Sequence, residues 1–357
     1  MKKALLNILF LTFLISSIFS CGTKEGKLPT VRLITTASDI HNNSINASVW
    51  KGFLDFYGDT AENQQHKGKF YDITSCQSQD LYKSTLEQLI TEEHDLIITT
   101  EVVFADIIND IADKYPTQNF MLMDTNKNAI NKPNVQVHNY NEEQGAFLIG
   151  AFAALKSIDD EIENPKFGFI GGVTCKTVLE FEAGYIQGLR HVIPNLPDEN
   201  ILTYYANDWN TPEKARTQAK NWFDYGIYTI FSVADKTGDG TITQAKEYRK
   251  VGKNVWAIGV NGDQHEDGIY EANKSAVLTS MIKKADTIVI NALHNTKYNT
   301  FTGSITEENV ATDGVGYAIT NKTEISDTII KKMHDIKMYI SNGDIIVYST
   351  YEQGVNQ

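Results

Sequence analysis

Two polar residues that follow apolar runs point to a ligand site. The run Tyr228–Val233 ends shortly before Asp235, and a second run, Val255–Val260, leads directly into Asn261. A helical segment, Thr241–Val251, joins the two runs, which predicts a βαβ unit with parallel strands. Small ligands bind beyond the carboxyl ends of such strands, so we expect Asp235 and Asn261 to contact a ligand.

The segment Asp235–Gly240 imitates a calcium-binding loop, which needs oxygen ligands at positions 1, 3, 5 and 12 and a glycine at position 6. Position 12 is Lys246, a cation where the loop needs a bidentate carboxylate, and Glu247 comes one residue too late. A strand followed by a helix also differs from the helix–loop–helix context of such loops. We therefore predict no metal here and interpret Gly238 and Gly240 as turn residues.

Sequence signatures of catalysis are missing. The chain has no GxGxxG, GxxxxGK[ST] or GxSxG motif, and its histidines and cysteines lack metal-ligand spacing. Cys76 and Cys175 could form a disulfide or remain separate thiols.

Asp124, which ends an apolar run, and Lys283 could form an acid–base pair, but a ligand-orienting pair is favoured. We predict a protein that is not an enzyme and uses no cofactor or metal.

The N-terminus has the pattern of an export signal. Two lysines precede the apolar run Ala4–Phe19, which is short for a membrane span, and Cys21 follows after one serine. This pattern resembles a bacterial lipobox, in which Cys21 becomes the lipidated first residue; a plain signal peptide with a chance cysteine is the alternative. We expect a signal peptide over 1–20 and a lipidated tether over 21–30. The protein would be anchored in the cell membrane or outer membrane, facing the periplasm or the exterior.

The mature chain is strongly acidic. Removing residues 1–20 leaves 30 basic and 45 acidic residues, a formal net charge of −15. Affinity for phosphate backbones and anionic lipid headgroups comes largely from clustered lysine and arginine. We therefore expect no nucleic-acid partner.

Apolar runs alternate with helical patterns along the chain, and the pattern restarts after an acidic insertion at 159–165. The predicted strands are Val31–Thr36, Phe70–Ile73, Asp95–Thr100, Asn119–Asp124, Val135–His138, Lys166–Gly172, Ile201–Ala206, Tyr228–Val233, Val255–Val260, Ala276–Ile282, Gly314–Thr320 and Asp344–Val347. Two successive βα sets predict an α/β protein with two doubly wound, parallel-sheet lobes and a cleft between them. No linker rich in proline, glycine or serine separates the lobes, so the chain is expected to pass between them more than once. The predicted N-terminal lobe is 31–140 plus 281–312, and the C-terminal lobe is 141–280 plus 313–357.

An asparagine-rich segment, 37–46, leads from the first strand into a helix. Backbone N–H groups and side-chain amides at a helix start can hold a polar ligand, so Asn46 is a candidate contact. An ordinary turn with an N-cap is the alternative.

Seven blocks of sequence, in a fixed order, carry a resemblance to a known family. The blocks are Ser44–Gly52, Glu142–Gly150, Gly168–Gly172, Phe181–Gly184, Thr237–Gly240, Ala257–Val260 with Asp263–Gln264, and Leu278–Lys283. They resemble the basic membrane protein family of bacterial lipoproteins, the purine-nucleoside-binding proteins of ABC uptake systems. The resemblance runs from about Val31 to Thr320. It implies a type I periplasmic-binding fold, three crossovers between the lobes and an ABC permease as partner.

Carried over by position, the family's ligand contacts fall on Thr36, Ile45, Asp124, Trp209, Asp235, Asn261 and Lys283. The family typically has aspartate in place of Thr36 and Asn261, a base-stacking phenylalanine in place of Ile45, and glycine in place of Asp235. These departures remove one aromatic wall and two carboxylates. We therefore expect weaker or altered binding of adenosine, guanosine and inosine, with preference for a modified nucleoside or another ring-bearing solute. Lys283 loses a charge partner at position 261 and could gain Asp235.

We interpret the chain as a lipid-anchored solute-binding protein whose lobes close on a nucleoside or related small molecule and hand it to an ABC permease. A closing receptor needs a ring-binding wall and a few polar groups that become buried. Trp209 and the polar set Asp124, Asn261 and Lys283 would supply them. A surface lipoprotein acting as an adhesin or a sensory receptor subunit is the alternative, and an α/β enzyme is less favoured.

Overall fold

The computed structural model describes residues 26–36, 40, 44–125 and 130–350. The predicted signal peptide, Cys21 and the first residues of the predicted tether lie outside these ranges. Of the helices that the structure describes, none is both long and apolar enough to cross a membrane.

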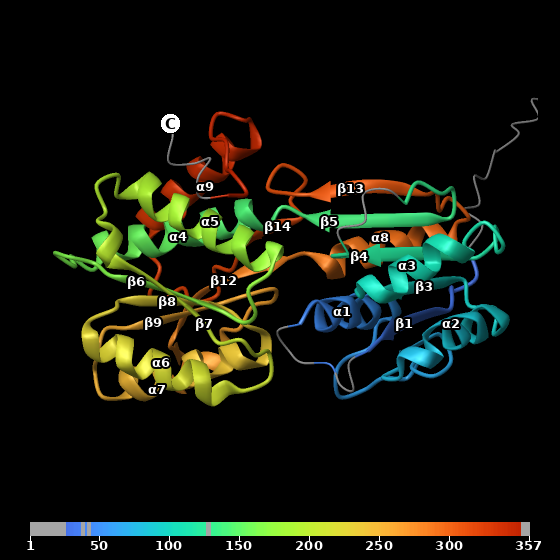
Figure 1. The fold of residues 1–357 in the computed structure, drawn as a ribbon, viewed down its shortest axis with the longest axis horizontal. Coiled ribbons are helices and arrows are strands. Elements are labelled where there is room, and N and C mark those ends of the chain that lie inside the picture. Colours follow the sequence, from blue (N-terminus) through green and yellow to red (C-terminus); the bar gives the residue numbers. More distant parts are fainter. Residues whose placement is uncertain (1–25, 37–39, 41–43, 126–129, 351–357) are drawn as a thin grey trace, which may run out of the picture.

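The first of two lobes is built on a six-stranded sheet (Figure 1). Its strands are β1 (Val31–Thr35), β2 (Tyr71–Ser75), β3 (Leu96–Thr99), β4 (Asn119–Met123), β5 (Val135–Tyr140) and β13 (Ser304–Glu308). All are parallel, in the order β13-β5-β4-β3-β1-β2. Helices α1 (Ile45–Tyr57) and α8 (Ala285–Lys297) share a core on one face, and α2 (Tyr82–Thr91) and α3 (Val102–Ile111) share a core on the other.

The second lobe repeats this plan. Its strands are β6 (Phe167–Gly171), β7 (Ile201–Tyr205), β8 (Thr229–Val233), β9 (Trp256–Gly259), β12 (Val277–Lys283) and β14 (Val315–Tyr317). The order is β14-β12-β9-β8-β6-β7, and β14 alone is antiparallel to its neighbour. Helices α4 (Glu142–Asp159), α5 (Lys176–Val192) and α9 (Asp327–Ser341) contribute to one core, and α6 (Pro212–Tyr225) and α7 (Asp239–Lys250) to the other. A small antiparallel hairpin, β10 (Ile269–Glu271) and β11 (Lys274–Ser275), precedes β12.

Strands covered by helices on both faces need apolar side chains on both faces, which explains why the apolar runs predicted the sheets so well. Every residue of β3 and of β6 is buried. The prediction of an α/β protein with two doubly wound lobes is confirmed.

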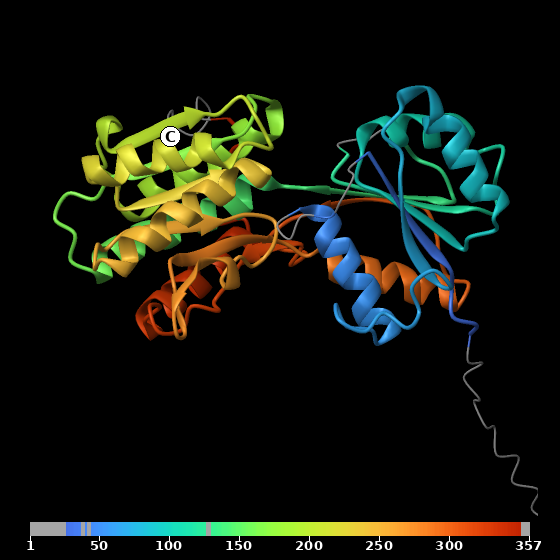
Figure 2. The same cartoon turned by 90° about the horizontal axis from the view of Figure 1, so that it is seen from below.

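The chain passes between the lobes three times, as Figure 2 shows at the narrow waist of the molecule. It crosses from β5 to α4, from β12 to α8, and from β13 to β14. The crossovers follow from the sheet order, because β12 belongs to the second sheet whereas α8 packs against α1 on the first. This confirms that no single linker separates the lobes.

The predicted strand Asp344–Val347 is wrong. Helix α9 ends at Ser341, and Gly343, two residues beyond it, has a φ of 79°. The backbone N–H groups of Asp344 and Ile345 then donate to the carbonyl of Tyr339, which turns the chain back onto the helix. Ile345 and Val347 pack against a core of the second lobe instead of joining a sheet, and Ile346 is exposed.

The lobe boundaries also differ in detail from the sequence assignment. Residue 281 falls inside β12, whose last three residues pair with β14 in the second sheet. Pro29 and Thr30 were assigned to the tether, but the Pro29 carbonyl accepts a hydrogen bond from Tyr57 and Thr30 bonds to Asp95. Strand β13 was not predicted, because its polar, largely exposed residues form an edge strand without an apolar pattern.

The interpretation of Gly238 and Gly240 as turn residues is wrong. Residues Asp235–Gly238 form a short 3-10 helix that continues into α7, and Gly238 has a helical φ of −61°. Gly240 lies so close to α6 that an added Cβ would stand 1.9 Å from the Pro212 carbonyl oxygen. This glycine therefore permits the close approach of two helices.

Candidate functional site

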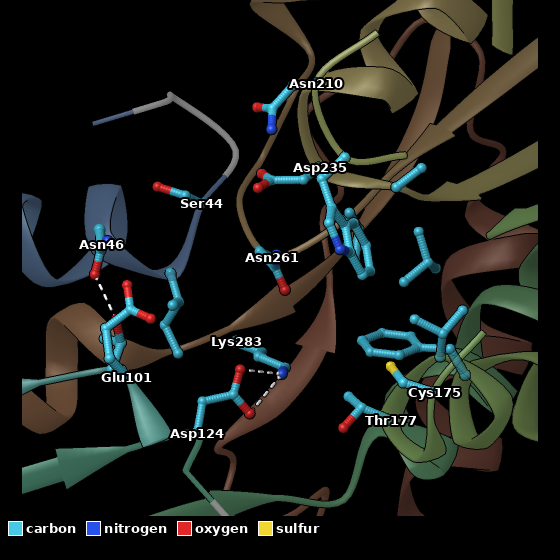
Figure 3. A pocket seen from close by; sticks show the side chains of 18 of the residues that line it. Ser44, Asn46, Glu101, Asp124, Cys175, Thr177, Asn210, Asp235, Asn261 and Lys283 are labelled. Carbon is cyan, nitrogen blue, oxygen red and sulfur yellow. Dashed lines mark hydrogen bonds and ion pairs between the residues drawn. The ribbon is translucent and has the colours of Figure 1, made fainter. Parts of the chain in front are cut away.

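A cavity of about 640 Å³ lies between the two lobes (Figure 3). It opens where the carboxyl ends of strands from both sheets face each other, which is the expected place for a ligand in parallel sheets. All eight candidate residues line it, namely Thr36, Ile45, Asn46, Asp124, Trp209, Asp235, Asn261 and Lys283. The structure therefore brings together every side chain that the sequence predicted to belong to one site.

Three of these residues share an unusual backbone conformation. Asp124, Asp235 and Asn261 follow β4, β8 and β9, with φ of 60°, 49° and 65°. Most side chains avoid this left-handed region, but Asp and Asn tolerate it, and Gly adopts it without strain. The turn out of the strand therefore restricts the residue type, and Asp or Asn at these positions fits that restriction.

On the wall of the first lobe, Asn46 is held by both ends of its amide. Its Nδ2 donates to Thr35 Oγ1 at 3.2 Å, and its Oδ1 accepts from Thr100 Oγ1 at 2.7 Å. Ser44 caps α1 through a bond from the Ala47 N–H at 3.2 Å. Ser44 is therefore an N-cap residue, and it lines the cavity together with Asn46. Residues 37–39 and 41–43 of the asparagine-rich segment lie outside the described residues.

Glu101 is a cavity residue that the sequence analysis missed. It follows β3 at the same sheet edge as Asp124. Its Oε1 accepts hydrogen bonds from Thr35 Oγ1 at 3.0 Å and from Thr36 Oγ1 at 3.2 Å. The signal was present in the sequence, because Glu101 comes directly after the predicted strand Asp95–Thr100.

The wall of the second lobe is aromatic and apolar. Trp209, in the loop between β7 and α6, lies with Phe181 and Val178 of α5 on this side. Its ring lies against the backbone of Gly172, where an added Cβ would stand 2.3 Å from the indole. The Trp209 carbonyl also accepts from the Thr237 N–H at 2.9 Å, so the loop is fixed from both sides.

Lys283, at the end of β12, forms the floor of the cavity. Its Nζ donates to Asp124 Oδ2 at 2.8 Å and to Glu142 Oε1 at 2.8 Å, and Figure 3 shows the contacts with Asp124. The rings of Tyr140 and Phe181 flank the ammonium, with centroids at 4.9 and 5.4 Å. The expected partner Asp235 is not among these contacts; Glu142, at the start of α4, takes that place.

Lys283, Asp124 and Glu142 form a triad at the floor of the cavity, and burial affects the pKa of its members Lys283 and Glu142. Lys283 and Glu142 are 2% and 1% exposed. Burial lowers the pKa of Lys283, but Asp124 and Glu142 outweigh it and raise the pKa above its ordinary value. Burial also raises the pKa of Glu142 to about 8, against the opposing effect of Lys283.

Glu142 should make the stability of the protein depend on pH. Its folded-state pKa of about 8 exceeds its ordinary value of 4.5, so the folded state binds more protons between these values and loses stability as the pH rises. One such group changes the free energy of unfolding by at most about 1.4 kcal/mol per pH unit. Glu142→Gln should flatten this decline in urea-unfolding curves recorded from pH 5 to 8. An unchanged slope would show that Glu142 is ionised throughout.

The described residues contain no cluster of three or more His, Cys, Asp or Glu side chains able to hold a metal ion. The calcium-like segment is helical, so its side chains do not converge as in a calcium loop. Cys76 is buried and Cys175 is exposed at the cavity, and the two are separate thiols.

Comparison with known proteins extends the resemblance to almost the whole chain. Residues 30–351 match the Bmp family, described as ABC transporter substrate-binding protein PnrA-like. The CD4+ T-cell-stimulating antigen of Listeria innocua is 30% identical over 332 residues, which cover 91% of this chain and 89% of the relative. The ABC transporter nucleoside-binding protein BmpA of Lactococcus lactis is 28% identical over 324 residues, 87% of this chain and 89% of that protein.

Solved structures agree on the fold. An ABC transporter solute-binding protein from Aeropyrum pernix K1 superimposes with a TM-score of 0.74 at 19% identity, covering 92% of this chain and 96% of that one. At this identity the likeness concerns the fold alone, and it supports the type I periplasmic-binding architecture.

Proposed function

The chain belongs to the Bmp family of PnrA-like ABC transporter substrate-binding proteins, and from this premise we propose that it binds a nucleoside-like molecule between its lobes. As a member of that family it is a solute-binding protein of an ABC importer. The family consists of substrate-binding proteins, not of enzymes. The name of the Lactococcus lactis relative, a nucleoside-binding protein, supports the finer assignment.

One observation carries the proposal: side chains from both lobes line the same cavity. Trp209 of the second lobe offers a ring face for stacking, and Asn46 of the first offers a fixed amide. Asp124 and Lys283 form a charged floor at the crossovers. A ligand held by both walls draws the lobes together, and the three crossovers act as the hinge about which they close.

The proposed function is tested by what the protein retains and binds. Denaturing freshly purified protein and analysing the released small molecules by mass spectrometry should yield a compound with a purine or related ring. Isothermal titration of ligand-free protein with adenosine, guanosine, inosine and their ring-methylated derivatives should detect at least one binder. Release and binding of a sugar or an amino acid instead would refute the nucleoside assignment while leaving the solute-binding role intact.

We also propose that Cys21 carries a lipid anchor that keeps the protein at the membrane, facing away from the cytoplasm and close to its permease. The export pattern before Cys21 and relatives named basic membrane protein and lipoprotein support this. Cys21→Ala should abolish incorporation of labelled palmitate and move the protein from the membrane fraction to the soluble fraction. Cys175→Ala is the matched control, because it removes a different exposed thiol. Palmitate incorporation that survives in Cys21→Ala would refute the anchor.

A further inference from the structure

The cavity has an excess of carboxylates. Among the described residues that line it, the charged side chains are Glu101, Asp124, Asp235 and Lys283. The single ammonium, on Lys283, already contacts Asp124 and the buried Glu142 behind it. Its positive charge is thus engaged before any ligand arrives, and Glu101 and Asp235 place a further carboxylate on each wall of the cavity.

Glu101 is held in place by hydroxyl groups and not by a cation. Its Oε1 receives the two threonine bonds, from Thr35 and Thr36, and no lysine, arginine or histidine of the described chain forms an ion pair with it. Two hydroxyl donors orient a carboxylate but leave its negative charge in place. Asp235 lies on the opposite wall, at the end of β8, so a ligand between the lobes meets a carboxylate on each side.

The aromatic wall favours the same kind of ligand. Trp209 and Phe181 both line the cavity, and the face of an aromatic ring attracts a cation, most strongly when the ring is tryptophan. A positively charged planar ring would stack on Trp209 while the carboxylates balance its charge. A phosphate group would be disfavoured, because the Lys283 ammonium is already engaged by Asp124 and Glu142.

We propose that the cavity selects a nucleoside whose base carries a positive charge, such as one methylated at a ring nitrogen, and that Glu101 and Asp235 select for this charge. This inference rests on the proposed function and specifies its ligand class. The departure at Asp235 then has a role, since it adds a carboxylate to the second wall. Glu101 places a carboxylate beside Thr36, so the first wall keeps a negative charge.

Two isomers test the charge without changing the size of the ligand. 1-Methyladenosine is a cation at neutral pH, whereas N6-methyladenosine has the same non-hydrogen atoms and is neutral. In isothermal titrations with the unmodified protein, 1-methyladenosine should bind about tenfold or more tightly than N6-methyladenosine, because desolvated opposite charges attract strongly at contact distance. Adenosine 5′-monophosphate, which adds a phosphate, should bind more weakly than adenosine.

Charge-removing variants assign the preference to the two carboxylates. Glu101→Gln and Asp235→Asn, singly and together, should reduce the preference for 1-methyladenosine, and the double variant should abolish most of it. Asp110→Asn, which removes an exposed carboxylate at the far end of α3, should leave the preference unchanged. Melting curves confirm that each variant is folded.

The outcomes separate this inference from the proposed function. Equal or tighter binding of N6-methyladenosine by the unmodified protein would overturn the inference and uphold a nucleoside-binding function, and this comparison needs no variant. A preference for 1-methyladenosine that survives in the double variant would show that Glu101 and Asp235 are not its source. Failure of all nucleosides to bind would overturn both proposals.

Discussion

Replacing Lys283 by methionine is expected to lower the free energy of unfolding by about 3 to 5 kcal/mol, because it removes the cation from a buried site that also holds Asp124 and Glu142. Glu142 is 1% exposed, and its Oε1 is 2.8 Å from the Lys283 ammonium. Methionine keeps the volume of the lysine stem but supplies no donor. Urea unfolding followed by circular dichroism measures the loss.

Two further variants show whether the missing charge is the cause. Lys284→Met removes the neighbouring ammonium, which pairs with Asp313 at the surface, and should cost no more than about 1 kcal/mol. Combining Lys283→Met with Glu142→Gln should recover part of the stability, because glutamine cannot ionise at a buried site that has lost its cation. A single variant as stable as the unmodified protein would show that the triad contributes nothing to the fold.

Trp209→Ala should weaken ligand binding by about 2 to 4 kcal/mol, about 30-fold or more in Kd, because a ring in a closing cleft both stacks and excludes water. The indole lies against Gly172, so its removal takes a large ring out of the cavity wall. Isothermal titration with the nucleoside that binds the unmodified protein gives the change in Kd.

Two control variants separate the loss of stacking at Trp209 from a general loss of folded structure. Trp209→Phe keeps an aromatic face and should retain most of the affinity. Tyr225→Ala removes a ring that is 60% exposed and belongs to the end of α6, away from the cavity, and should not affect binding. An unchanged Kd in Trp209→Ala would exclude this ring from the ligand site.

Local patterns were sufficient to predict the sheets and much of the site. A strand buried on both faces is apolar along most of its length, so β3, β6 and β8 stand out as nearly continuous apolar runs. The residue after such a run lies at the sheet edge where ligands bind, which identified Asp124, Asp235 and Asn261. Ile45 and Lys283 were identified through the family resemblance, and they also line the cavity.

Elements without a continuous apolar pattern were not predictable in this way. Strand β13 is polar and lies at a sheet edge, so only its pairing with β5 makes it a strand. The apolar residues Ile345 and Val347 resemble a strand locally, but hydrogen bonds to the end of α9 direct them into the core.

The sequence by itself determined which strands form and which polar residues end them, because both depend on neighbours along the chain. The tertiary structure decided which charges meet. Glu142 and Lys283 are 141 positions apart, and only the crossovers between the lobes bring them into contact. Their burial, and hence the raised pKa of Glu142, results from the packing of α4, β12 and the strands around them. The same packing decides that the Lys283 ammonium contacts Asp124 and Glu142 and not the other carboxyl groups that line the cavity.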